Sequence, residues 1–144
     1  MIDNLQDFHS CVGETIMFCQ CIEQDIKFIY AGMLEGDFDE NYEDIGKWTL
    51  GRTVKNLQKL DNSDNKPYFH KNDYNLLEQI TSIRNYWAHE AYTYFIYEED
   101  TSAFLKKFKK EANRLENDHN RLDNVHKSVE KVRLNVLREY NRIN

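Results

Sequence analysis

The sequence predicts an all-α protein that forms one domain. Only 5 Gly and 1 Pro occur in 144 residues, and this scarcity of turn-forming residues argues against a many-stranded sandwich or barrel. Apolar residues recur in steps of three and four along several segments, which is the spacing of a buried helical face. Aromatic residues make up 13% of the chain, so large side chains are available for a core. We therefore expect residues 1–144 to fold as a single helical domain with a long C-terminal helix.

The first predicted helix covers residues 4–34. Gly13 lies inside it, where glycine costs about 1 kcal/mol relative to alanine, and this suggests that another helix approaches closely at that point. Gly32 and Gly36 mark the end of the helix. The apolar face consists of Leu5, Phe8, Val12, Ile16, Cys19, Ile22, Ile26 and Ile29.

Two more helices are expected in the middle of the chain, at residues 48–60 and from residue 72 or 73 to residue 94. Before them, residues 35–46 contain six acidic residues and no basic ones, so we expect a solvated acidic loop. An EF-hand calcium loop is excluded in this segment, because Tyr42 and Trp48 occupy the positions that require Gly and Glu.

The last predicted helix runs from about residue 101 to residue 143, with Asp100 as its N-cap. At about 1.5 Å per residue it would extend about 60 Å, so we expect it either to bend near residues 117–120 or to project and bind a partner. It is also basic, since residues 101–144 hold 11 Lys and Arg against 6 Asp and Glu, whereas residues 1–100 hold 8 against 19. Such an asymmetry is found in proteins that contact polyanions, although basic helices also occur on plain solvated surfaces.

No metal site, cofactor or membrane segment is expected. Cys19 and Cys21 point about 200° apart on a helix, so they share neither a metal nor a disulfide. Together with Cys11 they fit small apolar side chains in a reducing compartment. The longest nearly apolar run, residues 92–97, is too short for a membrane span of about 20 residues. Because residues 1–4 lack the basic and apolar regions of a secretory signal, we expect a cytoplasmic protein.

Residues 83–92 carry the polar pattern that most strongly suggests chemistry. On a helical wheel Asn85, His89 and Tyr92 fall at i, i+4 and i+7, on the side opposite the apolar face. Arg84 lies at the edge of that apolar face, where a permanently charged guanidinium needs an anion, a carbonyl or a partner subunit. The apolar face itself consists of Leu76, Ile80, Ile83, Trp87, Ala91 and Tyr94.

The sequence Arg84-Asn85-x-x-x-His89, near the end of the third predicted helix, resembles the signature of the HEPN superfamily, in which an Arg and a polar residue precede a His. Residues 49–57 also resemble the second-helix region of such domains. The resemblance implies an up-and-down bundle of four or five helices that dimerises through the motif helices. It also implies a function, because catalytic HEPN proteins are metal-independent endoribonucleases.

These residue types suit cleavage of RNA by its own 2′-OH. Imidazole titrates near about 6.5, so His89 would move protons, and the guanidinium of Arg84 would steady the extra charge on the phosphorane. Asn85 would orient the histidine or the phosphate. Arg84 and His89 lie about 140° apart on one helix, so we expect a symmetric homodimer in which two motif helices share one cleft.

The resemblance also suggests a setting and partners. In some HEPN toxins a Tyr lies two residues after the His, and a partner nucleotidyltransferase silences the toxin by modifying it. Here Tyr92 is one residue further from His89, and it is a candidate site-lining or modified residue. The expected function is a toxin, phage-defence or stress ribonuclease acting on RNA, with a small nucleotidyltransferase as candidate antitoxin. The alternative is a non-catalytic helical module that binds RNA, a nucleotide or a protein partner.

Four lysines near the start of the last helix are candidates for binding RNA phosphates, with an affinity that depends on salt. The alternative is a solvated surface, since lysines near a helix N-terminus oppose the helix dipole. The four are Lys106, Lys107, Lys109 and Lys110.

Overall fold

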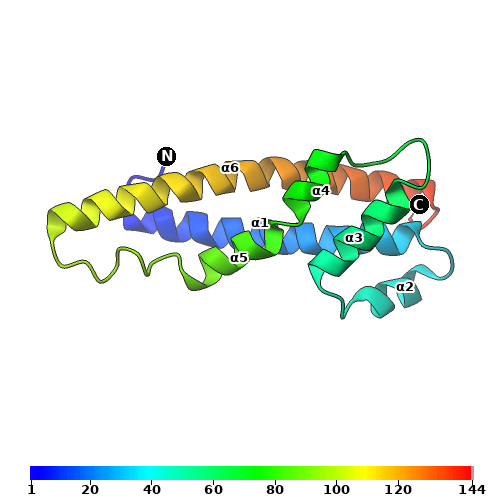
Figure 1. Ribbon diagram of the computed structural model, residues 1–144, viewed down its shortest axis with the longest axis horizontal. Helices are drawn as coiled ribbons and strands as arrows, with labels where there is room; N and C mark the ends of the chain where they lie inside the picture. Colours follow the sequence, from blue (N-terminus) through cyan, green and yellow to red (C-terminus); the bar gives the residue numbers. More distant parts are fainter. Residues whose placement is uncertain (144) are drawn as a thin grey trace.

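The structure, a computed structural model, describes residues 1–143, and their regular secondary structure is entirely helical. In chain order the helices are α1 (Leu5–Met33), α2 (Phe38–Ile45), α3 (Leu50–Asp61), α4 (Lys71–Leu77), α5 (Ile80–His89) and α6 (Thr101–Glu139). The predicted fold class is confirmed, since this is an all-α fold that ends in a long helix (Figure 1). Only Glu78 and Gln79 separate α4 from α5, so these two form one bent segment and the fold has five segments.

The two longest helices, α1 and α6, run parallel and side by side along the long axis of the molecule (Figure 1). The five segments alternate in direction along the chain, so the first segment, α1, and the fifth, α6, run the same way. Near one end the Met1 ammonium lies 3.0 Å from Glu116, and near the other Arg142 Nε donates to the carbonyl of Gly32 at 3.2 Å. The expected bend at residues 117–120 is absent, because α1 covers most of the 39-residue α6. None of the helices described is both sufficiently long and sufficiently apolar for a membrane span.

The core consists of two hydrophobic clusters along α1. The larger one surrounds the C-terminal part of α1, where α2, α3, α4 and the second half of α6 pack together. The smaller one joins the N-terminal part of α1 to α5, to the turns after α5 and to the first half of α6. Apart from the exposed Leu5, the predicted apolar face of α1 turns inward. The buried members of the smaller cluster are Phe8, Val12, Trp87, Ala91, Phe95, Ala112 and Leu115.

The acidic segment 35–46, expected to be a loop, contains the helix α2. Asp37 caps this helix by accepting the backbone N–H of Glu40 at 3.0 Å, and carboxylates in the first turn favour the positive end of the helix dipole. Tyr42 stacks on Phe28 of α1 with ring centroids 4.8 Å apart. The acidic residues therefore mask an amphipathic helix whose aromatic side packs on α1.

The third predicted helix, expected to reach residue 94, is broken into α4 and α5 and ends at His89. The chain changes direction between these helices, because α4 packs against α3 whereas α5 packs against α1. After His89 a series of turns at residues 90–97 folds around Phe8. The ring of Phe95 meets that of Phe8 edge-on at 5.4 Å and is fully buried. Packing of aromatic rings therefore determines the course of this segment, although its apolar spacing predicts a helix.

The close approach of a neighbouring helix to α1 occurs at Gly32. A Cβ atom placed there would lie 3.0 Å from a side-chain atom of Leu137 and 3.4 Å from one of Val136. Gly13 is exposed, and a Cβ atom there would meet nothing within 4 Å. The expectation of a close approach at Gly13 is therefore wrong.

Alanine at these two glycines is expected to have opposite effects on stability. Gly13→Ala restricts the unfolded chain at an exposed position inside a helix, and it should raise the free energy of unfolding by about 0.5–1 kcal/mol. Gly32→Ala pushes a methyl group against Leu137 and should lower that free energy by about 1–2 kcal/mol. Urea unfolding followed by circular dichroism measures both. A stabilising Gly32→Ala would contradict the tight packing of α6 on α1 at this position.

Candidate functional site

Helix α5 presents the residues of the predicted motif by burying its other side. Ile80 and Trp87 are buried in the core, and the indole N–H of Trp87 donates to Asp118 of α6 at 2.9 Å. These contacts fix the rotation of α5 about its own axis. Asn85 and His89 consequently lie on the outward side of the helix, where both are exposed.

Arg84 lies on a different side of α5 and is paired within the chain. Its Nη1 donates to Oε2 of Glu23 of α1 at 2.5 Å, so Glu23 is the anion that a guanidinium at the edge of an apolar face requires. Burial raises the pKa of Glu23, and the charge of Arg84 opposes part of that shift. The Arg84 side chain remains 31% exposed, so part of the guanidinium reaches solvent.

The exposed part of Arg84 borders a groove of about 450 Å³ between α1, α3 and α5, which we call the Arg84 groove. Lys27 also faces it, although its Nζ donates to the carbonyl of Gly46 at 3.2 Å. Two carboxylates, Glu23 and Glu78, lower the net charge of the groove, while the N-terminus of α3 adds free backbone donors. Its lining residues are Glu23, Lys27, Trp48, Thr49, Leu50, Gly51, Glu78, Thr81 and Arg84.

The structure brings Asn85 and His89 together and separates Arg84 from them. Asn85 and His89 are one turn apart on the same side of α5. Arg84 lies five residues before His89, about 140° around the helix, and it points to Glu23. The guanidinium and the imidazole therefore do not converge within one subunit.

The side chains of His9, His119 and His126 contact other segments of the fold, whereas His70 and His89 are exposed at helix ends. His119 Nε2 lies 2.5 Å from a carboxylate of α1, and the His126 ring packs against Phe18 with centroids 5.4 Å apart. His70 is exposed and is the N-cap residue of α4. Within residues 1–143 the His89 side chain forms no hydrogen bond or ion pair, and it is exposed at the end of a helix.

Tyr92 does not continue the row of Asn85 and His89, because α5 ends at His89. It lies in the turns that follow and is half-buried. Its hydroxyl lies 2.6 Å from Nδ1 of His9, and its ring meets Phe8 edge-on at 5.4 Å. Burial raises the pKa of Tyr92. The structure thus places this tyrosine in the packing between α1 and the turns after α5.

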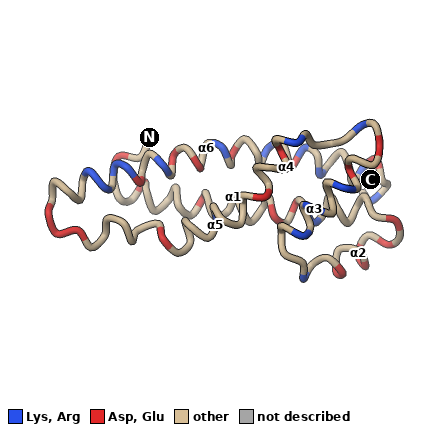
Figure 2. Tube along the Cα trace, viewed as in Figure 1, with Lys and Arg blue, Asp and Glu red and all other residues tan. Residues whose placement is uncertain are grey.

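The four candidate lysines lie in the first third of α6, where basic residues follow one another (Figure 2). Lys106, Lys107 and Lys110 line a hollow of about 350 Å³ together with Tyr94, whereas Lys109 lies outside it. Lys107 Nζ donates to Glu98 at 2.6 Å. Three of the four lysines therefore share one surface.

Arg114, which the sequence did not single out, extends the same side of α6. Its guanidinium carbon lies 3.6 Å from the centroid of the Tyr86 ring of α5. The Tyr86 hydroxyl donates to the buried Glu111 at 2.7 Å, and burial together with this hydrogen bond raises the pKa of Tyr86 to about 12. The sequence could have indicated Arg114 by its spacing, because Lys107, Lys110 and Arg114 recur at i, i+3 and i+7 and therefore share one side of a helix.

The three cysteines are free thiols. Cys19 is buried, and burial raises the pKa of its thiol to about 12. Within the described part of the chain, no group of three or more His, Cys, Asp or Glu side chains is arranged to hold a metal ion. Cys19 therefore acts as a small packing residue of the core.

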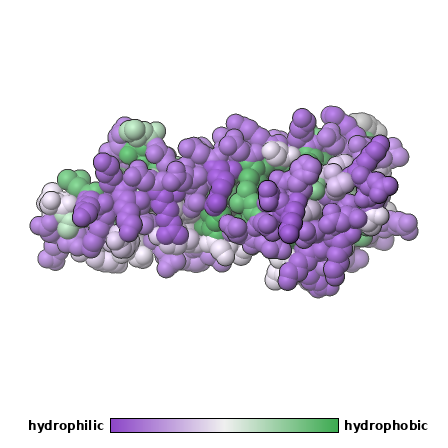
Figure 3. All heavy atoms as spheres, turned by 45° about the horizontal axis from the view of Figure 1, so that its top comes forward, coloured by the Kyte–Doolittle hydropathy of each residue, from purple (hydrophilic) through white to green (hydrophobic). Residues whose placement is uncertain are grey.

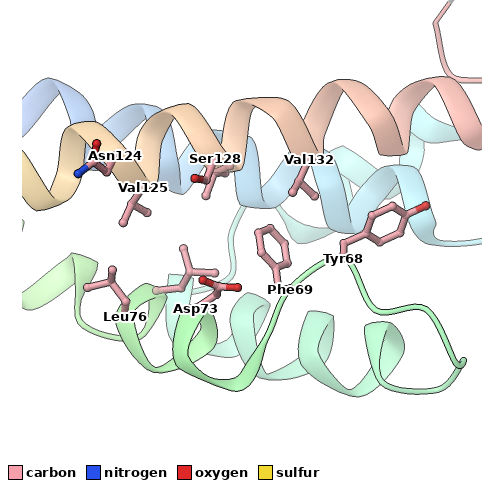
Figure 4. A pocket seen from close by; sticks show the side chains of 10 residues that line it. Tyr68, Phe69, Asp73, Leu76, Asn124, Val125, Ser128 and Val132 are labelled. Carbon is pink, nitrogen blue, oxygen red and sulfur yellow. The ribbon is translucent and has the colours of Figure 1, made fainter.

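A second kind of surface feature is apolar and lies away from the motif. Figure 3 shows a hydrophobic strip near the middle of a mostly hydrophilic face. A hollow of about 250 Å³ lies between α4 and α6, with Leu76, Val125 and Val132 among its lining residues (Figure 4). Its polar side chains, including Asp73 and Ser128, include no cation and no histidine. This hollow is therefore not suited to the chemistry that the motif suggests.

In comparisons with known proteins, no family model, no curated protein and no solved structure matches this chain.

Proposed function

We propose that this chain is a metal-independent endoribonuclease of the HEPN type, which cuts RNA in a cleft shared by two copies. In this proposal His89 moves the protons of the reaction, Arg84 steadies the charge on the phosphorane, and Asn85 orients the reacting groups. The 2′-OH attacks the neighbouring phosphate and the bond to the next nucleotide breaks. The products are a 2′,3′-cyclic phosphate end and a new 5′-OH end.

The exposed pair of Asn85 and His89 on one side of α5 is the observation that carries the proposal. The His89 ring is exposed on the outward side of α5 next to the exposed Asn85, and no hydrogen bond or ion pair of residues 1–143 occupies it. His9 and His119, by contrast, bind side chains of other segments. A polar pair that the fold does not use, held on a packed helix, is suited to contact a substrate or a second subunit.

A symmetric dimer is the second part of the proposal. Ser82 and Ala88 are exposed beside Asn85 and His89, so the outward side of α5 includes small side chains that let another helix approach. Two-fold symmetry makes such a surface meet a copy of itself. In such a dimer, Arg84 of one copy and His89 of the other copy would contact the same phosphate.

Arg84 retains donors for a phosphate in spite of its ion pair. Glu23 accepts one hydrogen bond from Nη1, whereas a guanidinium has five N–H donors. The partly exposed side chain lines the Arg84 groove, where an anion can reach the remaining donors. This geometry supports a role in steadying phosphate charge.

The resemblance of residues 84–89 to the HEPN signature also suggests a cellular setting. We place the protein in the cytoplasm as a toxin, phage-defence or stress effector that acts on RNA. A small nucleotidyltransferase is the proposed antitoxin, with Tyr92 as its candidate target. Because the Tyr92 hydroxyl contacts His9, modification of Tyr92 would have to displace that contact.

Cleavage in the presence of a chelator tests the proposal. The purified protein should cut single-stranded RNA in excess EDTA and leave cyclic phosphate ends, because proton transfer and charge stabilisation come from side chains. The cyclic phosphate ends are identified by mass spectrometry and by their resistance to alkaline phosphatase, which removes only terminal monophosphates. Cleavage that requires a divalent metal would contradict the metal-independent mechanism. The absence of cleavage in all conditions would contradict the assignment and favour a non-catalytic helical module.

A further inference from the structure

A row of basic residues on α6 lies against aromatic rings of α5 and of the turns that follow it. We define the basic row as Lys106, Lys107, Lys110 and Arg114. The Nζ atoms of Lys107 and Lys110 lie 5.7 and 5.5 Å from the ring centroid of Tyr94. The guanidinium carbon of Arg114 lies 3.6 Å from the ring centroid of Tyr86. The lysines of the row and Tyr94 also line the hollow of about 350 Å³.

Most of the charge of the basic row is not compensated. Glu111 is the only acidic residue among residues 101–115, and it is 5% exposed. Lys107 pairs with Glu98 at 2.6 Å, whereas the salt bridges of the described residues do not include Lys110 or Lys106. The surface therefore carries a positive charge in a chain whose net charge is −6.

Arg114 places one end of this charge over Tyr86, which lies one turn of α5 before His89. Tyr86 and His89 are three residues apart on α5, and such residues are neighbours on a helix surface. The guanidinium of Arg114 lies over the Tyr86 ring, and a guanidinium has five N–H donors with which it can bind a phosphate. No carboxylate of residues 1–143 forms a salt bridge with Arg114.

Exposed tyrosines accompany the lysine end of the basic row. Tyr94 is 46% exposed and Tyr97 is 84% exposed, both in the turns after α5. Proteins that bind single-stranded nucleic acid combine cations along the backbone with aromatic rings on which bases stack. An acidic peptide would use the cations and not the rings, so this combination favours a nucleic acid.

We propose that the basic row and these tyrosines bind single-stranded RNA and lead the strand to His89. Lys110 and Arg114 hold phosphates, and Tyr94 and Tyr97 stack bases. This inference rests on the proposed ribonuclease function and deepens it by assigning the surface that binds the substrate.

The test measures binding separately from cleavage, in a His89→Ala background. A fluorescent oligouridine RNA is titrated with two triple variants that each remove three positive charges from α6. We expect the Kd of the row variant, which lacks three charges of the basic row, to rise at least about tenfold. The plot of the logarithm of the association constant against the logarithm of the salt concentration should become less steep, with a slope smaller in magnitude by about 2. The Kd of the control variant should change less than about twofold. The row variant is Lys106→Ala, Lys110→Ala, Arg114→Ala, and the control, at exposed positions further along α6, is Lys127→Ala, Lys131→Ala, Arg138→Ala.

A substitution that keeps the charge tests the stacking role. Tyr94→Leu should weaken binding at least about fivefold, because it removes the ring and leaves the lysines. Unchanged binding by the row variant, or equal weakening by both triple variants, would overturn the proposal. A polyglutamate peptide that competes as well as RNA would overturn the choice of RNA.

The outcomes separate this inference from the ribonuclease proposal. RNA binding that depends on the basic row, in a protein that cuts no RNA, would support the binding surface and reject the enzyme. Cleavage that depends on His89 and proceeds normally in the row variant would support the enzyme and reject the binding surface.

Discussion

Alanine at His89 is expected to lower the rate of RNA cleavage by about 10²–10⁴-fold, which is the contribution of a positioned acid–base group. The free energy of unfolding should change by less than about 0.5 kcal/mol, because the ring is exposed and lies outside the core. Single-turnover cleavage of a labelled RNA in excess EDTA measures the first quantity, and urea unfolding measures the second. A loss of activity without a loss of stability is the signature of a catalytic role.

His70→Ala is the matched control for this substitution. His70 is also exposed, and it precedes the first residue of α4. The His70 variant should cut RNA at the rate of the unmodified protein. Undiminished cleavage by His89→Ala, or an equal loss in the two variants, would contradict the role assigned to His89.

Mixing two impaired variants tests whether the cleft is shared between subunits. Arg84→Gln removes the positive charge and keeps a donor for Glu23, and alone it should lower cleavage by about 10²-fold or more. A mixed dimer of Arg84→Gln and His89→Ala contains one cleft in which both groups are intact, so subunit exchange should restore activity. No recovery after exchange, or a monomer by light scattering at micromolar concentration, would contradict the shared cleft.

Trp87→Ala is expected to cause the largest loss of stability. The indole is 1% exposed and belongs to the smaller core cluster, where its ring meets that of Phe8 edge-on at 6.4 Å. Truncation leaves a cavity and removes the N–H that donates to Asp118. The free energy of unfolding should fall by about 3–5 kcal/mol.

Two further variants serve as comparisons for Trp87→Ala. The stability of all three is measured by urea unfolding followed by circular dichroism. Trp87→Phe keeps much of the ring and should cost less than Trp87→Ala. Tyr97→Ala, at a position 84% exposed, should change the stability by less than about 0.5 kcal/mol. A Trp87→Ala variant as stable as Tyr97→Ala would show that α5 is not anchored as described. Because this anchor sets the rotation of α5, we also expect Trp87→Ala to reduce cleavage.

The helical class and the orientation of the motif helix follow from local periodicity. Phe8 and Val12 in α1, and Ile80 and Trp87 in α5, are buried as their spacing predicts. Apolar side chains at such intervals stay on one side of any helix they form, whatever that helix packs against. The exposure of Asn85 and His89 could be predicted for the same reason.

Sequence periodicity failed where the packing of distant side chains outweighed local composition. The acidic residues around Tyr42 indicated a loop, yet stacking on Phe28 holds a helix there. Burial of Phe95 against Phe8 ends the helical path soon after His89. Gly13 was expected to mark a close contact, but the contact lies at Gly32, because a glycine in a sequence does not reveal what approaches it.

By itself the sequence determined an all-helical chain, a long basic last helix, and a helix whose outer side carries Asn85 and His89. Only the tertiary structure decided that α1 and α6 lie parallel, that Glu23 pairs with Arg84, and that Arg114 lies on Tyr86. The physical reason is that helical periodicity reports which side of a segment is buried, while ion pairs and stacked rings depend on which segments the whole core brings together.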